Sequence, residues 1–151
     1  MTTRVLCLGN ALLADDGLGP AVAEQLRRLR LPDVEIVETA ESGFYLLDHI
    51  LNCARLVVVD AISSRGAPAG TIHCLGETEA RGGRGGSPHY VGLFDVLETA
   101  RQMKLHAPDE VLIFAVEAED LLTIGGSMTP RVRAAVPQVI ARIRELLAVP
   151  V

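Results

Sequence analysis

Two segments of the chain are apolar throughout, and they constrain the fold more than any other feature. Residues 56–59 read LVVV and are followed by Asp60, while residues 111–116 read VLIFAV. Such short runs without alternating polar residues are typical of strands buried on both faces, as in parallel sheets covered by helices. The segment 56–60 is therefore predicted to lie centrally in a sheet of this kind.

The rest of the chain alternates between strand-like and helix-like patterns. Apolar residues recur every three or four positions in the helix-like segments, and turn residues bound the strand-like runs. The predicted strands are 4–8, 34–38, 56–60, 71–75 and 111–116, and the predicted helices are 18–29, 44–54, 89–103 and 130–147. Right-handed crossovers then place the first three strands in the order 2-1-3.

The strand predicted at 71–75 follows the central strand too closely for a parallel crossover, which needs about a dozen residues or more. It is therefore expected to be an antiparallel edge strand. The predicted fold class is a three-layer α/β/α sandwich with a mostly parallel five-stranded sheet, in one domain covering residues 1–151. Residues 76–86 (GETEARGGRGG) carry little apolar surface and are expected to form a flexible, solvated loop.

Charge and composition exclude several functional classes. The net charge is −5 and the basic residues are scattered, which argues against nucleic acid or an anionic membrane as the main partner. No apolar segment approaches the roughly 18 residues that span a bilayer, and a cytoplasmic location is expected. Cys7, Cys53 and Cys74 are odd in number and lack C-x-x-C spacing, which indicates reduced core thiols rather than zinc ligands or disulfides.

Candidate site residues follow two strands that are predicted to be neighbours. Asp15 and Asp16 lie in the loop after the first strand, and Asp60 ends the third. In an open α/β sheet, ligands bind beyond the carboxyl ends of the strands at such a switch point. Taken alone, however, the pair Asp15 and Asp16 fits helix capping at least as well, because carboxylates accept the orphan N–H groups of a first helical turn.

His89 is a third candidate, at the start of the helix predicted from that residue. Two carboxylates and one imidazole suit a borderline divalent ion such as zinc or nickel. The spacing by itself equally fits a histidine that merely begins a helix. His49, His73 and His106 are interpreted as structural or solvated.

Taken together, the motifs resemble the NiFe hydrogenase maturation endopeptidases. The matching segments are LGN at 8–10, DDG at 15–17, VDA at 59–61, PAGT at 68–71, SPH at 87–89 and MTP at 128–130. The resemblance implies an aspartic-type endopeptidase that removes the C-terminal extension of a nickel-loaded hydrogenase large-subunit precursor. It also implies that Asp16, Asp60 and His89 are both the catalytic and the metal-contacting set.

The resemblance leaves two mechanisms open. In one, a bound ion activates the attacking water. In the other, which we favour, the ion is nickel supplied by the precursor, and Asp16, Asp60 and His89 detect its presence; zinc binding in vitro is a further expectation. The family's Gly-Thr-x-Gly pattern is replaced here by Ala-Glu-Ser-Gly at 40–43, so Glu41 is expected to affect which precursor is recognised.

Two other functions are compatible with the predicted fold class, a receiver-like phosphoacceptor module and another hydrolase. A receiver-like phosphoacceptor module needs its acids directly at the end of the first strand and a lysine after a late strand. Here Asp15 and Asp16 come several residues later, and Val116 is followed by Glu-Ala-Glu-Asp. Another hydrolase on the same phosphorylase-like or hydrolase-like fold is the better alternative.

Overall fold

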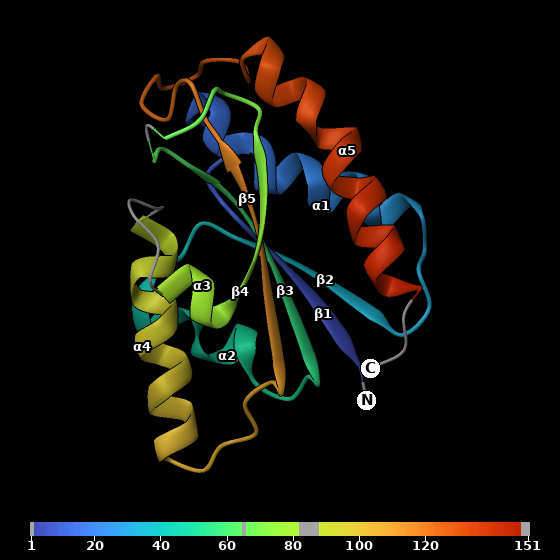
Figure 1. Cartoon of the computed structure of the whole chain (residues 1–151), viewed down its shortest axis with the longest axis vertical. Helices are drawn as coiled ribbons and strands as arrows, with labels where there is room; N and C mark the ends of the chain where they lie inside the picture. Colours follow the sequence, from blue (N-terminus) through green and yellow to red (C-terminus); the bar gives the residue numbers. More distant parts are fainter. Residues whose placement is uncertain (1, 65, 82–87, 149–151) are drawn as a thin grey trace.

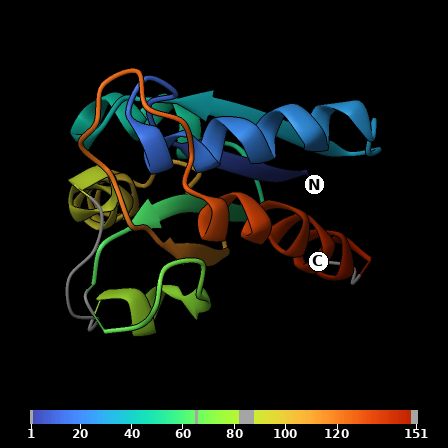
Figure 2. The same ribbon diagram turned by 90° about the horizontal axis from the view of Figure 1, so that it is seen from above.

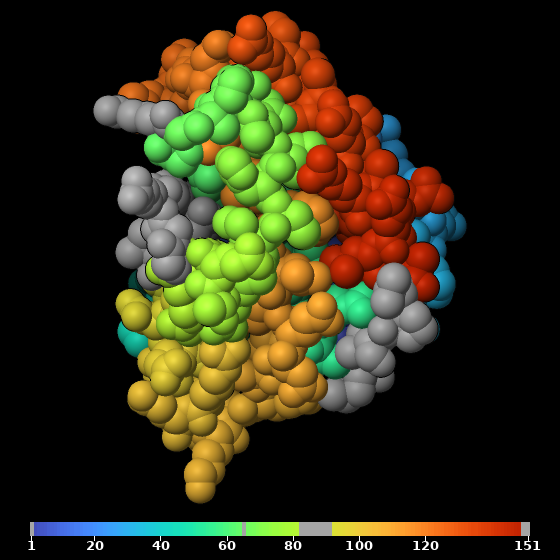
Figure 3. Space-filling view, in the orientation of Figure 1, coloured from blue at the N-terminus to red at the C-terminus, as the bar shows by residue number. Residues whose placement is uncertain are grey.

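The computed structural model describes residues 2–64, 66–81 and 88–148, with no description of the side chains of residues 88–91. Its strands are β1 (Thr3–Leu8), β2 (Val34–Thr39), β3 (Arg55–Ile62), β4 (Ile72–Gly76) and β5 (Glu110–Glu117). Its helices are α1 (Leu18–Arg28), α2 (Leu47–Ile50), α3 (Glu77–Arg81), α4 (Pro88–Gln102) and α5 (Pro130–Leu147), with short 3₁₀ turns η1 (Ala14–Gly17) and η2 (Gly43–Leu46). Figure 1 shows their arrangement, and Figure 3 shows the molecule in the same orientation as a space-filling view.

The sheet has the strand order β2-β1-β3-β5-β4. Strands β2, β1, β3 and β5 are parallel, and β4 pairs with β5 in the antiparallel direction. Both the order of the first three strands and the antiparallel edge strand are therefore confirmed. Strand β3 lies between β1 and β5, and all of its residues are buried, as its uninterrupted apolar sequence predicts.

Helices cover both faces of the sheet, which confirms the three-layer arrangement. Helices α1 and α5 lie on one side, and α2 and α4 lie on the other (Figures 1 and 2). Successive residues of β3 alternate between the two cores: Val57 and Val59 pack with α1 and α5, whereas Leu56 and Val58 pack with α4. Within the described ranges, no helix combines the length and apolar character needed to cross a membrane.

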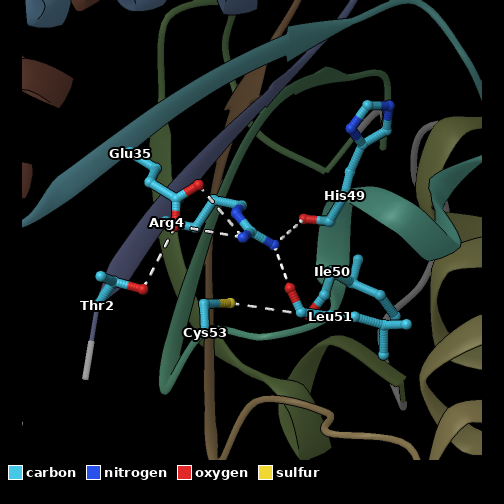
Figure 4. A network of polar contacts seen from close by, with 7 residues as sticks. All are labelled: Thr2, Arg4, Glu35, His49, Ile50, Leu51 and Cys53. Atoms are coloured by element: carbon cyan, nitrogen blue, oxygen red, sulfur yellow. Dashed lines mark hydrogen bonds and ion pairs between the residues drawn. The ribbon is translucent and has the colours of Figure 1, made fainter.

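The prediction of a single helix at 44–54 is wrong. The segment is divided between η2 and α2, and α2 ends at Ile50. The cause is Arg4, a buried residue of β1 whose guanidinium donates hydrogen bonds to the carbonyl oxygens of His49 and Leu51 at 2.9 and 2.5 Å (Figure 4). Because these carbonyls accept from a side chain of the sheet, the chain turns here instead of continuing the helix.

The flexible loop predicted at 76–86 is also partly wrong. Gly76 ends β4, and residues 77–81 form α3. Ala80 is buried, and the Glu77 carboxylate accepts two hydrogen bonds from Arg101 of α4, at 2.8 and 2.7 Å. These contacts order a segment that has almost no apolar surface of its own; residues 82–86 lie outside the described residues.

The Glu77 contact predicts a dependence of stability on pH. Hydrogen bonds from Arg101 lower the pKa of Glu77 against the opposing effect of burial. A carboxyl group with a depressed pKa stabilises the folded state fully above its unfolded-state pKa, and this contribution is lost as the pH falls through the folded-state pKa. We expect Glu77→Gln to lower the free energy of unfolding by up to about 1 kcal/mol near pH 7.

The measurement is urea unfolding of both proteins at a series of pH values. The difference between them should shrink as the pH falls below about 4.3, the ordinary pKa of glutamate. Glu145→Gln, at an exposed position of α5, is the matched control. A difference that stays constant down to acid pH would show that the ion pair with Arg101 contributes nothing.

The interpretation of the cysteines as core thiols holds for two of the three. Cys7 and Cys53 are buried, but Cys74 is exposed on the edge strand β4. All three thiols are free, and burial raises the pKa of Cys7 to about 12. A thiol with so high a pKa carries almost no thiolate at neutral pH, so Cys7 is a packing residue.

Candidate active site

The turn from β1 into α1 is unusually tight, and two glycines make it possible. Gly9 has φ +144°, and a Cβ atom at that position would overlap the carbonyl oxygen of Asp16. A Cβ atom at Gly19 would overlap the carbonyl oxygen of Leu8. This close packing fixes η1, with Asp15 and Asp16, against the carboxyl end of β1.

Asp15 is a structural residue that joins two loops. Its fully buried carboxylate accepts hydrogen bonds from the backbone N–H groups of Glu119, Asp120 and Thr129 at 2.9, 2.8 and 2.6 Å. The Thr129 hydroxyl donates to the same carboxylate at 2.9 Å. Asp15 therefore holds the loop between β5 and α5 against η1, and this loop lies beside the β1–α1 turn in both ribbon views (Figures 1 and 2).

The capping alternative is wrong for the pair Asp15 and Asp16. Neither η1 nor α1 has a hydrogen bond from a side chain at its N-cap residue. Thr129, which precedes α5, likewise makes no side-chain cap, because its hydroxyl is directed to Asp15. Asp15 instead bonds a loop that is distant in the sequence, and Asp16 bonds the backbone of its own turn at Asn10.

Asp16 and Asp60 lie at the same edge of the sheet, as predicted. The Asp16 carboxylate accepts a hydrogen bond from the Asn10 backbone N–H at 2.8 Å, and η1 contacts β3. Asp60 is fully buried and pairs in register with Ala115 of β5. Since Val58 and Ile62 pack in the core under α4, the alternation of the strand directs Asp60 to that same face.

Helix α4 begins at Pro88, so His89 lies in its first turn, which is the upper end of α4 in Figure 1. A Cβ atom on Gly92 would lie 2.9 Å from the Cα atom of Gly43, so the start of α4 approaches η2 backbone to backbone. The His89 side chain itself lies outside the described residues.

The metal-contacting set of Asp16, Asp60 and His89 therefore stays a prediction. Among the side chains that the structure describes, no group of three histidine, cysteine, aspartate or glutamate residues is arranged to hold a metal ion. The donor chemistry of the two placed members fits the expectation, because carboxylate oxygens are ligands for divalent ions.

Glu117 is a buried acid that the sequence reasoning did not single out as a site residue. It ends β5, is 2% exposed, and accepts hydrogen bonds from both the backbone N–H and the hydroxyl of Ser64. His73 of β4 lies 3.1 Å from it through Nε2. Glu117 thus ties the edge strand and the loop after β3 to the sheet. In the sequence Glu117 shares one feature with Asp60, because each is an acidic residue that ends an apolar run.

A cavity of about 580 Å³ opens on the other side of η1. Ala14, Gly17, Arg27, Glu38 and Met128 are among its lining residues, and neither Asp16 nor Asp60 is. This cavity is therefore separate from the two candidate acids, although η1 borders both.

Comparison with known proteins decides the family. Residues 20–146 match the family model described as hydrogenase maturation protease. The chain belongs to the hydrogenase maturation protease family. It is 37% identical to the hydrogenase 2 maturation protease of Escherichia coli, over 96% of this chain and 92% of that protein. It is also 34% identical to the hydrogenase expression/formation protein HoxM of Azotobacter vinelandii, over 95% of this chain and 71% of that protein.

The fold agrees with this assignment. The structure of the hydrogenase maturating endopeptidase HybD from E. coli superposes with a TM-score of 0.84 at 30% identity, covering 98% of this chain and 93% of that one. Family membership confirms the resemblance that the sequence motifs indicate. The receiver-like module and the other hydrolases on this fold are therefore set aside.

Proposed function

We propose that this maturation protease is an endopeptidase that removes the C-terminal extension of a NiFe hydrogenase large-subunit precursor after nickel has been loaded. The observation that carries the proposal is the position of Asp16 and Asp60, two buried acids at the carboxyl ends of the adjacent strands β1 and β3, in a chain of this family. In an open α/β sheet this edge is where ligands bind.

The proposed roles follow from the chemistry of the side chains. The nickel ion is part of the substrate, and Asp16, Asp60 and His89 contact it, so a precursor without nickel lacks the interaction that positions it. The Asn10 N–H bond to Asp16 and the packed strand that carries Asp60 hold the two carboxylates in place before the substrate arrives. Hydrolysis also needs a group that takes a proton from water, and a carboxylate of this pair is suited to that role.

Glu41 is the proposed contributor to precursor selection. It lies in the loop after β2, and its carboxylate is 3.2 Å from both the Thr39 hydroxyl and His49 Nε2. These contacts present an acidic group at the same edge of the sheet as Asp16. They support a role for Glu41 in distinguishing one precursor from another.

The test is cleavage of a purified nickel-loaded precursor, followed by mass spectrometry of the product. We expect His89→Ala and Asp16→Asn to reduce the cleavage rate by about 100-fold or more, since each removes a group that contacts the reacting complex. His106→Ala, at an exposed position after α4, is the matched control and should cleave at the wild-type rate. Wild-type cleavage by His89→Ala, or equal cleavage of precursor without nickel, would overturn the proposed function.

A further inference from the structure

Three large apolar side chains stand exposed beside the candidate active site. Leu12, Leu122 and Ile124 are 65%, 86% and 81% exposed. Their loops are joined, because Leu13 forms an isolated antiparallel bridge with Ile124, and the Gly125 N–H donates to the Leu12 carbonyl oxygen at 2.7 Å. We call Leu12, Leu122 and Ile124 the apolar ridge.

The backbone of the ridge is held in place. The Asp120 carboxylate accepts hydrogen bonds from the N–H groups of Leu122 and Thr123 at 2.9 and 3.0 Å. Asp15 binds the same loop at Glu119, Asp120 and Thr129. The ridge therefore displays apolar side chains on an ordered backbone, so a partner that binds there does not have to order the loop.

Exposed apolar side chains gathered in one place mark interaction surfaces on soluble proteins. The charges around the ridge indicate the chemistry of the partner. Glu119 is exposed and Asp120 is half-buried, and both lie on the side of the ridge that precedes Leu122 in the chain. On the other side of the loop, Arg133 donates a hydrogen bond to the Met128 carbonyl oxygen at 3.1 Å, so the acidic rim is confined to the side of Glu119 and Asp120. Hydrogen bonds from Thr123 and Leu122 lower the pKa of Asp120, which keeps it charged. An apolar surface with an acidic rim is complementary to an apolar segment flanked by basic residues.

We propose that the apolar ridge docks such a segment, apolar with flanking lysine or arginine residues, on the hydrogenase precursor; this rests on the proposed function. The occupant is argued from continuity with the site. Leu12 belongs to the same β1–α1 turn as Asp16, and Asp15 joins the rest of the ridge to that turn. When the cleavage site of a polypeptide lies at Asp16, neighbouring residues of that polypeptide lie beside the apolar ridge.

The experiment compares the Leu122→Ser/Ile124→Ser double variant with wild type on the nickel-loaded precursor. We expect KM and the Kd for the precursor to rise at least about tenfold, since exposed apolar anchors contribute to binding, while kcat at saturating precursor is unchanged. Met103→Ser is the matched control, because Met103 is 63% exposed just beyond the other end of α4. Glu119→Gln should weaken binding chiefly at low salt.

The outcomes separate the two proposals. Unchanged KM and Kd in the double variant would overturn docking at the ridge and leave the proposed function intact. A wild-type protein that binds the precursor through the ridge without cutting it would support docking and overturn the proposed function. A wild-type dimer that the double variant converts to a monomer would overturn the proposal in favour of a second copy of this chain. The melting temperature of each variant verifies that it is folded.

Discussion

Replacing Asp15 by alanine is expected to lower the free energy of unfolding by about 3–5 kcal/mol, although the adjacent Asp16 is the residue proposed for function. The Asp15 carboxylate is fully buried and accepts hydrogen bonds from three backbone N–H groups and one hydroxyl. Alanine leaves all of these donors without an acceptor. Each unsatisfied buried donor costs about 1–3 kcal/mol, and partial entry of water reduces the sum.

Denaturant unfolding measures the effect, and two variants serve as comparisons. Thr129→Val removes only the hydroxyl donor and should cost about 1 kcal/mol. Asp16→Asn should leave the free energy of unfolding close to that of wild type while cleavage is lost, because the amide oxygen of asparagine can still accept the Asn10 N–H bond. A loss of less than about 1 kcal/mol in Asp15→Ala would show that the loop after β5 is held by other contacts.

Replacing Gly9 by alanine is expected to cost about 3–5 kcal/mol and to abolish cleavage as well. Gly9 combines φ +144° with a Cβ position that overlaps the Asp16 carbonyl oxygen. The new methyl group therefore forces the backbone of η1 away from β1, and Asp16 moves with it. Stability and activity should fall together, in contrast to Asp16→Asn.

Gly125→Ala is the matched control for Gly9→Ala. Gly125 has φ +73°, but a Cβ atom there meets nothing within 4 Å. Its substitution should cost only the strain of a left-handed backbone, about 1–2 kcal/mol. Both variants are measured by denaturant unfolding and by precursor cleavage. Equal losses of stability in the two would show that backbone strain alone, and not the overlap with Asp16, determines the effect at Gly9.

Local patterns in the sequence were sufficient to predict the five strands and the order of β2, β1 and β3, but not the position of β5 between β3 and β4. The two apolar runs identify β3 and β5 as buried parallel strands, and the short connection before β4 requires an antiparallel edge strand. These features follow from burial periodicity and chain length, which act over neighbouring residues. The prediction that Asp16 and Asp60 lie at one edge of the sheet follows in the same way, because the carboxyl ends of parallel strands lie at the same edge.

When the partner of a residue lies far away in the chain, only the tertiary structure determined which contact that residue makes. Arg4 ends α2, and Arg101 orders α3, across separations that local periodicity does not report. Asp15 and Asp16 are identical in type and adjacent in sequence, yet Asp15 accepts the N–H groups of a loop more than 100 residues away, as its bonds to Glu119 and Asp120 show. A side chain's role depends on which groups the fold places within hydrogen-bond distance, and for Asp15 those groups come from the other end of the chain.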